Sequence, residues 1–129
     1  MRKEETKMNT WIGTGRLTDA PVVRSTQSGN PVCSFTIAID EYWGKGDDEK
    51  KTTFVPIIVW GKVGENCGKY LEKGQLVNVR GRLQIRSYTD KDGIKRRAAE
   101  IVASEVEFGA KAKHSGTEAG KEPEEDIPF

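Results

Sequence analysis

The chain has 129 residues, of which 35% are hydrophobic and 32% charged, and its formal net charge is +1. This length suits one domain with a tail rather than two domains. No apolar run approaches the roughly 18–20 residues of a membrane-spanning helix, and residues 1–7 lack the apolar stretch of a secretory signal, so we expect a cytoplasmic protein.

The charge is unevenly divided between the body of the chain and its C-terminal end. Residues 118–129 hold five acids and one base, which leaves residues 1–117 with 20 bases against 15 acids and a net charge of +5. A basic body with an acidic end can attract two partners of opposite charge.

Three β-strands are predicted in the first half of the chain, over residues 9–18, 32–43 and 52–61. Turn-forming residues at 19–21 and 28–31 separate the first two strands. Apolar and polar side chains alternate along the second strand, which is typical of a half-buried strand. The polar segment that follows predicts an exposed loop over residues 44–51.

One short helix is predicted over residues 62–73, where the period of the apolar residues changes. The residues that would share one helix face, at i, i+4, i+7 and i+8, are Val63, Cys67, Tyr70 and Leu71. Gly64 and Gly68 each weaken such a helix by about 1 kcal/mol relative to Ala. Gly74 is placed where a C-terminal cap would stand.

Two further strands are predicted over residues 75–88 and 95–108, joined by a turn that contains Asp92-Gly93. An Asp-Gly pair between alternating strands is typical of a β-hairpin. Three strands, a helix and a hairpin form the element order of an all-β OB-fold, a five-stranded Greek-key barrel with its helix between strands three and four.

The chain divides into four predicted segments, which are a flexible leader, a folded domain, a flexible linker and an acidic tip. They cover residues 1–7, 8–108, 109–121 and 122–129. Residues 109–129 have almost no apolar content before their last three residues, so we expect this tail to be disordered.

The predicted strand over residues 75–88 presents a basic face. Alternation directs Val77, Val79, Leu83 and Ile85 toward the core. The opposite face holds Asn78, Arg80, Arg82, Gln84, Arg86 and Tyr88. Taken alone, this face could be a solvated polar surface or a binding surface.

The predicted strand over residues 52–61 is apolar on both faces. Val55, Ile57 and Val59 suit a barrel interior, so Phe54 and Trp60 are expected outside it. The alternative places these two rings in the core or at a subunit interface. Trp43 ends the preceding strand, and strict alternation puts it on the core side unless a bulge or the strand end turns it outward.

Exposed rings interleaved with Arg and Lys match the chemistry of single-stranded nucleic acid. An unstacked base that stacks on an aromatic ring gains about 1–3 kcal/mol, whatever the base. The phosphates attract Lys and Arg through counterion release without reading sequence. Because a duplex hides its base faces, exposed rings discriminate in favour of single strands.

The acidic tip predicts a second function. The residues of the tip predicted to bind partners are Glu124, Glu125, Asp126, Ile127, Pro128 and Phe129. The terminal carboxylate and the last ring can enter a pocket with an apolar floor and a basic rim, while the acids raise the encounter rate. Apolar residues at the end of a tail do not increase solubility, so we expect the tip to recruit partner proteins.

No residue pattern indicates an enzyme. The sequence has no cluster of metal ligands, no nucleophile with a His base and no phosphate-binding loop, so no catalytic residue, metal or cofactor is expected. Cys33 and Cys67 fit neither a zinc spacing nor a disulfide framework and are predicted to be buried free thiols.

Taken together, these residues resemble the bacterial single-stranded DNA-binding proteins. The similarity is carried, in chain order, by residues 8–21, 32–38, 54–62, 70–74, 77–83 and 126–129. Each segment is common alone, but their order together with this tail is specific to the family.

The resemblance implies roles for individual residues. Bases would stack on Trp43, Phe54, Trp60 and Tyr88. The residues that match those following the DNA backbone are Lys62, Lys73, Arg82 and Arg86, and four further candidates are Arg16, Arg80, Arg96 and Arg97. The family also implies a nucleoid-associated homotetramer whose tip recruits replication, recombination and repair proteins.

Two other functions use the same features. An RNA-binding OB-fold module would rely on the same stacking, and the barrel alone does not distinguish it. A primosome-like adaptor that binds mainly protein would instead bury the four aromatic rings at interfaces.

Overall fold

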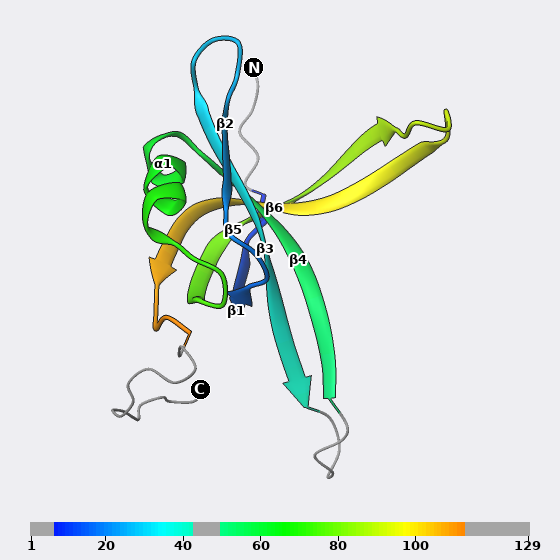
Figure 1. Ribbon diagram of the computed structural model, residues 1–129. Helices are drawn as coiled ribbons and strands as arrows, with labels where there is room; N and C mark the ends of the chain where they lie inside the picture. The colour runs from blue at the N-terminus through cyan, green and yellow to red at the C-terminus, as the bar shows by residue number, and fades with distance from the viewer. Residues whose placement is uncertain (1–6, 43–49, 113–129) are drawn as a thin grey trace.

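The computed structural model describes residues 7–42 and 50–112. Trp43, most of the predicted loop, the first six leader residues and the acidic tip therefore lie outside the described residues. The elements in chain order (Figure 1) are β1 Trp11–Leu17, β2 Val22–Ser25, β3 Pro31–Tyr42, β4 Lys50–Trp60, α1 Gly61–Tyr70, β5 Leu76–Thr89 and β6 Lys95–Phe108.

The strands form one sheet that closes on itself as a barrel. Their order is β1-β5-β6-β4-β3-β2, and β1 also pairs with β3, which joins the two sides of the sheet. All pairings are antiparallel except that between β4 and β6, which covers residues 57–59 of β4. Five of the strands and the helix follow the predicted order, and the helix lies between β4 and β5.

The short strand β2 is an addition that the sequence did not predict. It pairs only with β3, and all four of its residues are exposed. An exposed edge strand has no buried face, so it leaves no alternating pattern in the sequence.

Two pairs of strands extend beyond the barrel as hairpin arms (Figure 1). We define the β3–β4 arm as residues 39–42 and 50–53, and the β5–β6 arm as residues 84–89 and 95–100. Each arm is two-stranded because β4 pairs with β6 only at residues 57–59 and β5 pairs with β1 only as far as Gly81.

The β5–β6 arm corrects one expectation about burial. Val77 and Val79 lie in the core as predicted, but Leu83 and Ile85 are 46% and 58% exposed. Alternation still places all four on one side of β5. The last two lie at and beyond the end of the barrel, however, where none of the described elements covers that side.

Gly81 marks the point where β5 leaves the barrel. The register with β6 shifts between Arg80 and Gly81, so that Ser104 is an extra residue on β6. A Cβ atom at Gly81 would lie 2.2 Å from the Val102 carbonyl oxygen. Only glycine permits this approach of the two backbones, and the bulge adds to the local twist.

The helix α1 is shorter than predicted, and Gly74 does not cap it. It ends at Tyr70, where the Leu71 N–H donates to the Cys67 carbonyl oxygen. Gly74 has a φ of 84° in a turn closed by a hydrogen bond from the Gln75 N–H to the Glu72 carbonyl oxygen. This turn needs a left-handed residue, which explains the glycine four positions after the helix.

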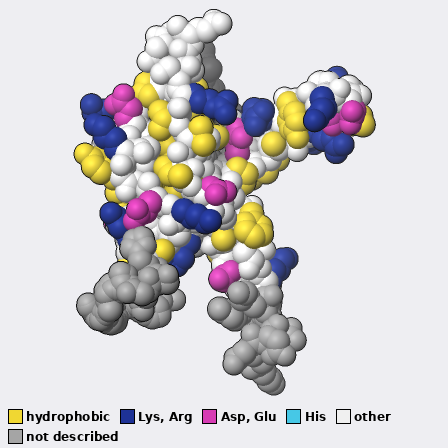
Figure 2. Space-filling model, in the orientation of Figure 1, with side chains coloured by type: hydrophobic (Ala, Val, Ile, Leu, Met, Phe, Trp, Pro, Cys, Tyr) yellow, Lys and Arg dark blue, Asp and Glu magenta, His cyan; other side chains and the backbone are white. Residues whose placement is uncertain are grey.

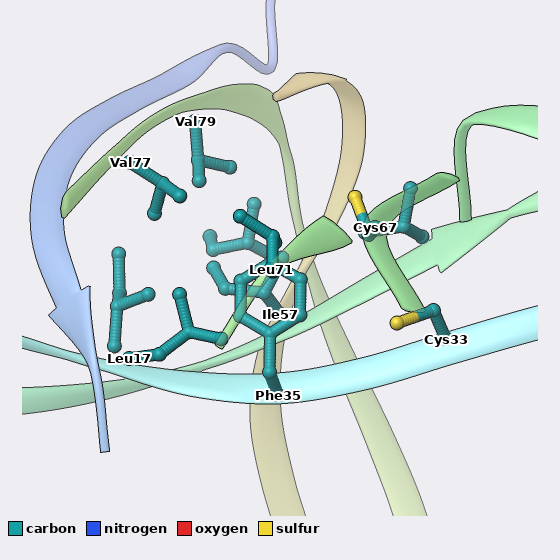
Figure 3. Packing of buried hydrophobic residues seen from close by; sticks show 11 residues of the cluster. Leu17, Cys33, Phe35, Ile57, Cys67, Leu71, Val77 and Val79 are labelled. Atoms are coloured by element: carbon teal, nitrogen blue, oxygen red, sulfur yellow. The ribbon is translucent and has the colours of Figure 1, made fainter. Parts of the chain in front are cut away.

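The core fills the barrel between the sheet and α1 (Figure 3). Its members are Leu17, Cys33, Phe35, Ile37, Ile57, Val59, Cys67, Leu71, Val77, Val79 and Ile101. None of the described helices is long and apolar enough to cross a membrane.

The cysteines Cys33 of β3 and Cys67 of α1 are buried free thiols, as predicted, and they lie near each other in Figure 3. Burial raises the pKa of Cys33 from its ordinary value of 9.0 to about 11. Burial and the neighbouring Cys33 raise the pKa of Cys67 to about 12. Both groups are therefore held as inert thiols at neutral pH.

We expect the native protein to react slowly with a thiol reagent at pH 8 and both cysteines to react at once in urea. Since the folded state disfavours the thiolates, their contribution to stability is complete below pH 9 and is lost as the pH rises toward 11–12. Urea unfolding at pH 7 and pH 10 measures this loss. Rapid labelling of the folded protein at pH 8 would contradict the burial.

Candidate nucleic-acid interface

The side of the β3–β4–β6–β5 sheet that points away from the core forms one continuous surface, which we call the outer face. The register defines it, because residues paired across neighbouring strands point to the same side. One row crosses the face from Arg82 through Val102 and Ile58 to Ser34.

Among the side chains that the structure describes, three aromatic rings lie on the outer face. Phe54 and Trp60 of β4 are 63% and 48% exposed, and Tyr88 of β5 is 42% exposed. Their orientation on β4 follows from the alternation, since Ile57 and Val59 between them are fully buried. The structure thus places both β4 rings outside the barrel.

The Phe54 ring remains exposed because its neighbours on β3 are small. Phe54 is paired with Ala38, and the next outer-face positions on β3 are Thr36 and Ser34. These short side chains leave open space beside the Phe54 ring. A flat base can therefore reach the ring face without displacing a neighbour.

Trp11 has a different environment from Trp60. It packs against the core, and its indole lies across Gly13, where an added Cβ would meet the ring at 2.2 Å. Trp11 therefore has a structural role at the end of the barrel. Of the tryptophans in the described residues, only Trp60 belongs to the outer face.

Several of the predicted phosphate-binding residues share this face with the rings. Arg82 and Arg86 lie on the same side of β5, with Gln84 between them on that side. Arg96 of β6 is paired with Tyr88. Arg16 of β1 is paired with Ala38, the residue that also pairs with Phe54. Figure 2 shows Lys and Arg side chains gathered at the end of the β5–β6 arm.

The other predicted phosphate-binding residues lie around this face or away from it. Lys62 follows Trp60 by two residues in the first turn of α1. Lys73 adjoins Gly74, whose carbonyl oxygen accepts a 3.0 Å hydrogen bond from Arg16 Nη1. Arg80 lies farther around the barrel, paired with Ile12.

Arg97 lies on the reverse side of the β5–β6 arm. It is paired with Ser87, and both point away from Tyr88 and Arg96. The sequence places Arg96 and Arg97 side by side, but a strand sends consecutive side chains to opposite faces.

Half of the eight predicted phosphate-binding residues are already paired with acids. The ion pairs are Lys62–Glu65 at 3.8 Å, Arg80–Glu105 at 3.7 Å, Arg86–Glu100 at 3.2 Å and Arg96–Asp90 at 2.6 Å. Arg82 has no acid within ion-pair distance among residues 7–42 and 50–112. No described acid therefore competes with a phosphate for Arg82.

Two residues of the outer face were not predicted as part of the site. Arg24 of β2 is paired with Val32, which in turn pairs with Trp60. It was missed because β2 itself was not predicted. Glu100 is a buried acid among basic residues. The sequence could have indicated it, because alternation puts this carboxylate on the same face of β6 as the apolar residues Ala98 and Val102.

A closed OB-type barrel with exposed rings and basic side chains on one sheet face is the architecture of a domain that binds single-stranded nucleic acid. Residues 8–109 match the model of the single-strand binding protein family. The chain belongs to this family.

Individual relatives agree with this assignment. Single-stranded DNA-binding protein 1 of Clostridium acetobutylicum is 41% identical over 102 residues, which are 78% of this chain and 93% of the relative. Single-stranded DNA-binding protein 1 of Staphylococcus aureus (strain MSSA476) is 44% identical over 101 residues, 78% of this chain and 65% of that protein.

A solved structure, described as a Plasmodium falciparum SSB complex with ssDNA, has a TM-score of 0.74 and 26% sequence identity to this chain. The match covers 82% of this chain and 98% of the other. The OB-fold predicted from the element order is confirmed.

Proposed function

We propose that this chain binds single-stranded DNA on its outer face, by stacking bases on aromatic rings and contacting phosphates with basic side chains, without reading base sequence. The observation that carries the proposal is the presence of Phe54, Trp60 and Tyr88, all at least two-fifths exposed, on one sheet face with Arg82. Exposed apolar rings are costly to leave in water unless a ligand covers them.

The two kinds of contact have separate tasks. Stacking contributes about 1–3 kcal/mol per base and distinguishes single strands from duplexes. Phosphate contacts add affinity that falls with salt, with a slope of about −0.7 per contact for single strands. We assign stacking also to Trp43. We assign phosphate contacts first to Arg82, Lys62 and Lys73, and then to Arg16 and Arg24.

The type of nucleic acid can be tested by competition. With a fluorescent oligo-dT bound, we expect unlabelled oligo-dT to displace it efficiently, oligo-U less well and duplex DNA of the same length hardly at all. Fluorescence anisotropy at two salt concentrations measures each competitor. Preferential displacement by oligo-U would favour an RNA-binding module, and no binding of any nucleic acid would favour a protein adaptor.

We further propose that the tip recruits replication, recombination and repair enzymes. The supporting features are the acids Glu124, Glu125 and Asp126 beside an apolar end formed by Ile127, Pro128 and Phe129. The protein itself has no catalytic role in this proposal and acts in the cytoplasm on exposed single strands.

Removal of residues 126–129 separates the two functions. We expect the shortened protein to bind oligo-dT as tightly as the full chain or slightly more tightly, because an acidic tail repels phosphates. We expect it to lose binding to partner enzymes. Titrations with oligo-dT and pull-down of a replication enzyme measure the two effects, and a loss of DNA binding on deletion would contradict this division.

Self-association as a homotetramer is also part of the proposal. Ile12 of β1 and Leu83 and Ile85 of β5 are exposed apolar residues away from the outer face. A second copy that covered them would bury apolar surface that the single chain leaves in water.

A further inference from the structure

Glu100 is a buried acid on a face otherwise suited to phosphates. It is 6% exposed, and among the described residues no other charged side chain is buried. Alternation and pairing place it on the outer face, opposite Gln84 of β5. A carboxylate in this position repels phosphates, and burying its charge is unfavourable unless partners compensate for the lost water. The contacts that Glu100 makes must therefore explain why it is there.

Both oxygens of Glu100 are occupied by neighbours on β5. Arg86 donates from Nε to Oε2 and from Nη2 to Oε1, each at 3.2 Å, and Gln84 Nε2 donates to Oε2 at 3.0 Å. This two-point contact fixes the plane of the guanidinium group as well as its position. The hydrogen bonds with Glu100 also raise the pKa of Arg86.

The guanidinium group fixed in this way lies against Tyr88. Its Cζ atom is 5.7 Å from the centroid of the Tyr88 ring. Tyr88 is also paired across the strands with Arg96 of β6, whose Nε is 2.6 Å from Asp90 Oδ2. The ring therefore has two arginine neighbours, and each of these arginines is held by its own acid.

We propose that Glu100 is a positioning residue that fixes Arg86 beside Tyr88, so that guanidinium and ring together form the stacking surface for a base. Arg86 then contributes a flat cationic surface and makes no phosphate contact of its own. This inference rests on the proposed function, and it revises the role first expected for Arg86.

The alternative is that Arg86 turns away from Glu100 to bind a phosphate. That movement would leave a buried carboxylate without its charged partner, which costs more than one exposed phosphate contact contributes. Arg82 has no such restraint. Arg82 and Arg86 of β5 thus have different roles although they lie on the same face, only four residues apart.

The dependence of oligo-dT binding on salt distinguishes the two roles. In a variant that carries Arg86→Met with Glu100→Gln, the face loses one positively charged and one negatively charged side chain. We expect its salt slope to equal that of the wild type, while affinity at high salt falls about 2- to 30-fold, the range of a cation–π contact. Arg82→Met is the matched control, and its slope becomes shallower by about 0.7.

Glu100→Gln alone provides a second readout that a merely structural role would not give. Arg86 keeps its charge but loses the carboxylate, and it becomes free to contact a phosphate. We expect the salt slope to become steeper by about 0.7, with weaker binding at high salt than the wild type. Thermal unfolding of each variant confirms that it is folded.

The results also separate this inference from the proposed function. A double variant whose slope becomes shallower by as much as that of Arg82→Met, or whose affinity is unchanged, would overturn the positioning role and leave DNA binding intact. Absence of oligo-dT binding by the wild-type protein would overturn both.

Discussion

Replacement of Phe54 by Ala is expected to weaken binding to oligo-dT by about 5- to 150-fold. This range corresponds to the loss of about 1–3 kcal/mol of stacking on one ring. Phe54 has the largest exposed fraction of the rings on the outer face, and its neighbour Ala38 gives it little to pack against. Its removal should therefore leave the fold intact. Titration by anisotropy and a thermal melt measure the two effects.

Two further substitutions at Phe54 separate stacking from simple apolar contact. Phe54→Trp retains a ring and should bind at least as tightly as the wild type, whereas Phe54→Leu keeps apolar bulk without a π-face and should resemble Phe54→Ala. If the Leu variant bound like the wild type, the ring would act as an apolar contact and the stacking role would be wrong.

Replacement of Gly64 by Ala is expected to destabilise the protein, although helix propensity alone predicts a gain of about 1 kcal/mol. Gly64 is buried where α1 packs on β4, and a Cβ there would lie 2.3 Å from the Val59 carbonyl oxygen. The helix would have to move away from the sheet, and such overpacking costs about 1–3 kcal/mol. Set against the gain in helix propensity, this leaves a net loss of up to about 2 kcal/mol, with a Tm lower by up to several degrees.

Gly68→Ala in the same helix is the matched control. The atom closest to an added Cβ at Gly68 is Cγ2 of Val23, on the exposed edge strand β2. A side chain on a free edge can move aside more easily than a backbone carbonyl inside a barrel, so this variant should lose less stability. An increase in Tm for Gly64→Ala would contradict the close packing of α1 on β4.

The sequence predicts most of the barrel because the strands of the barrel are half-buried. Alternation placed Val77, Val79, Ile57 and Val59 in the core correctly. The strands end where the alternation stops and turn-forming residues such as Asp92-Gly93 begin. A buried face therefore leaves a clear record in the sequence.

Features without a buried face left no such record. The edge strand β2 carries no alternation, so Arg24 could not be assigned to the outer face. Alternation gave the right side for Leu83 and Ile85 but not their exposure, because the length of the arm beyond the barrel depends on tertiary pairing.

The sequence predicted which types of residue form the candidate site, but not which of the arginines pair with acids or which of Arg96 and Arg97 lies on the same side as the rings. Rings and arginines at alternate positions indicated a binding face, but acids far away in the sequence decide which arginines are free. Glu100 binds Arg86 across 14 residues, and only the pairing of β5 with β6 brings them together. The same pairing places Arg97 on the reverse side of the arm.

The most direct test of the central claim is a tryptophan fluorescence titration with oligo-dT, in the wild type and in Trp60→Phe. Trp11 packs against the core and provides an internal baseline that DNA should not quench. We predict strong quenching of the wild type by oligo-dT, little by duplex DNA, and a smaller quenched fraction in Trp60→Phe with nearly unchanged affinity. Equal quenching of both proteins, or no quenching by any nucleic acid, would contradict the placement of Trp60 in a stacking surface on the outer face.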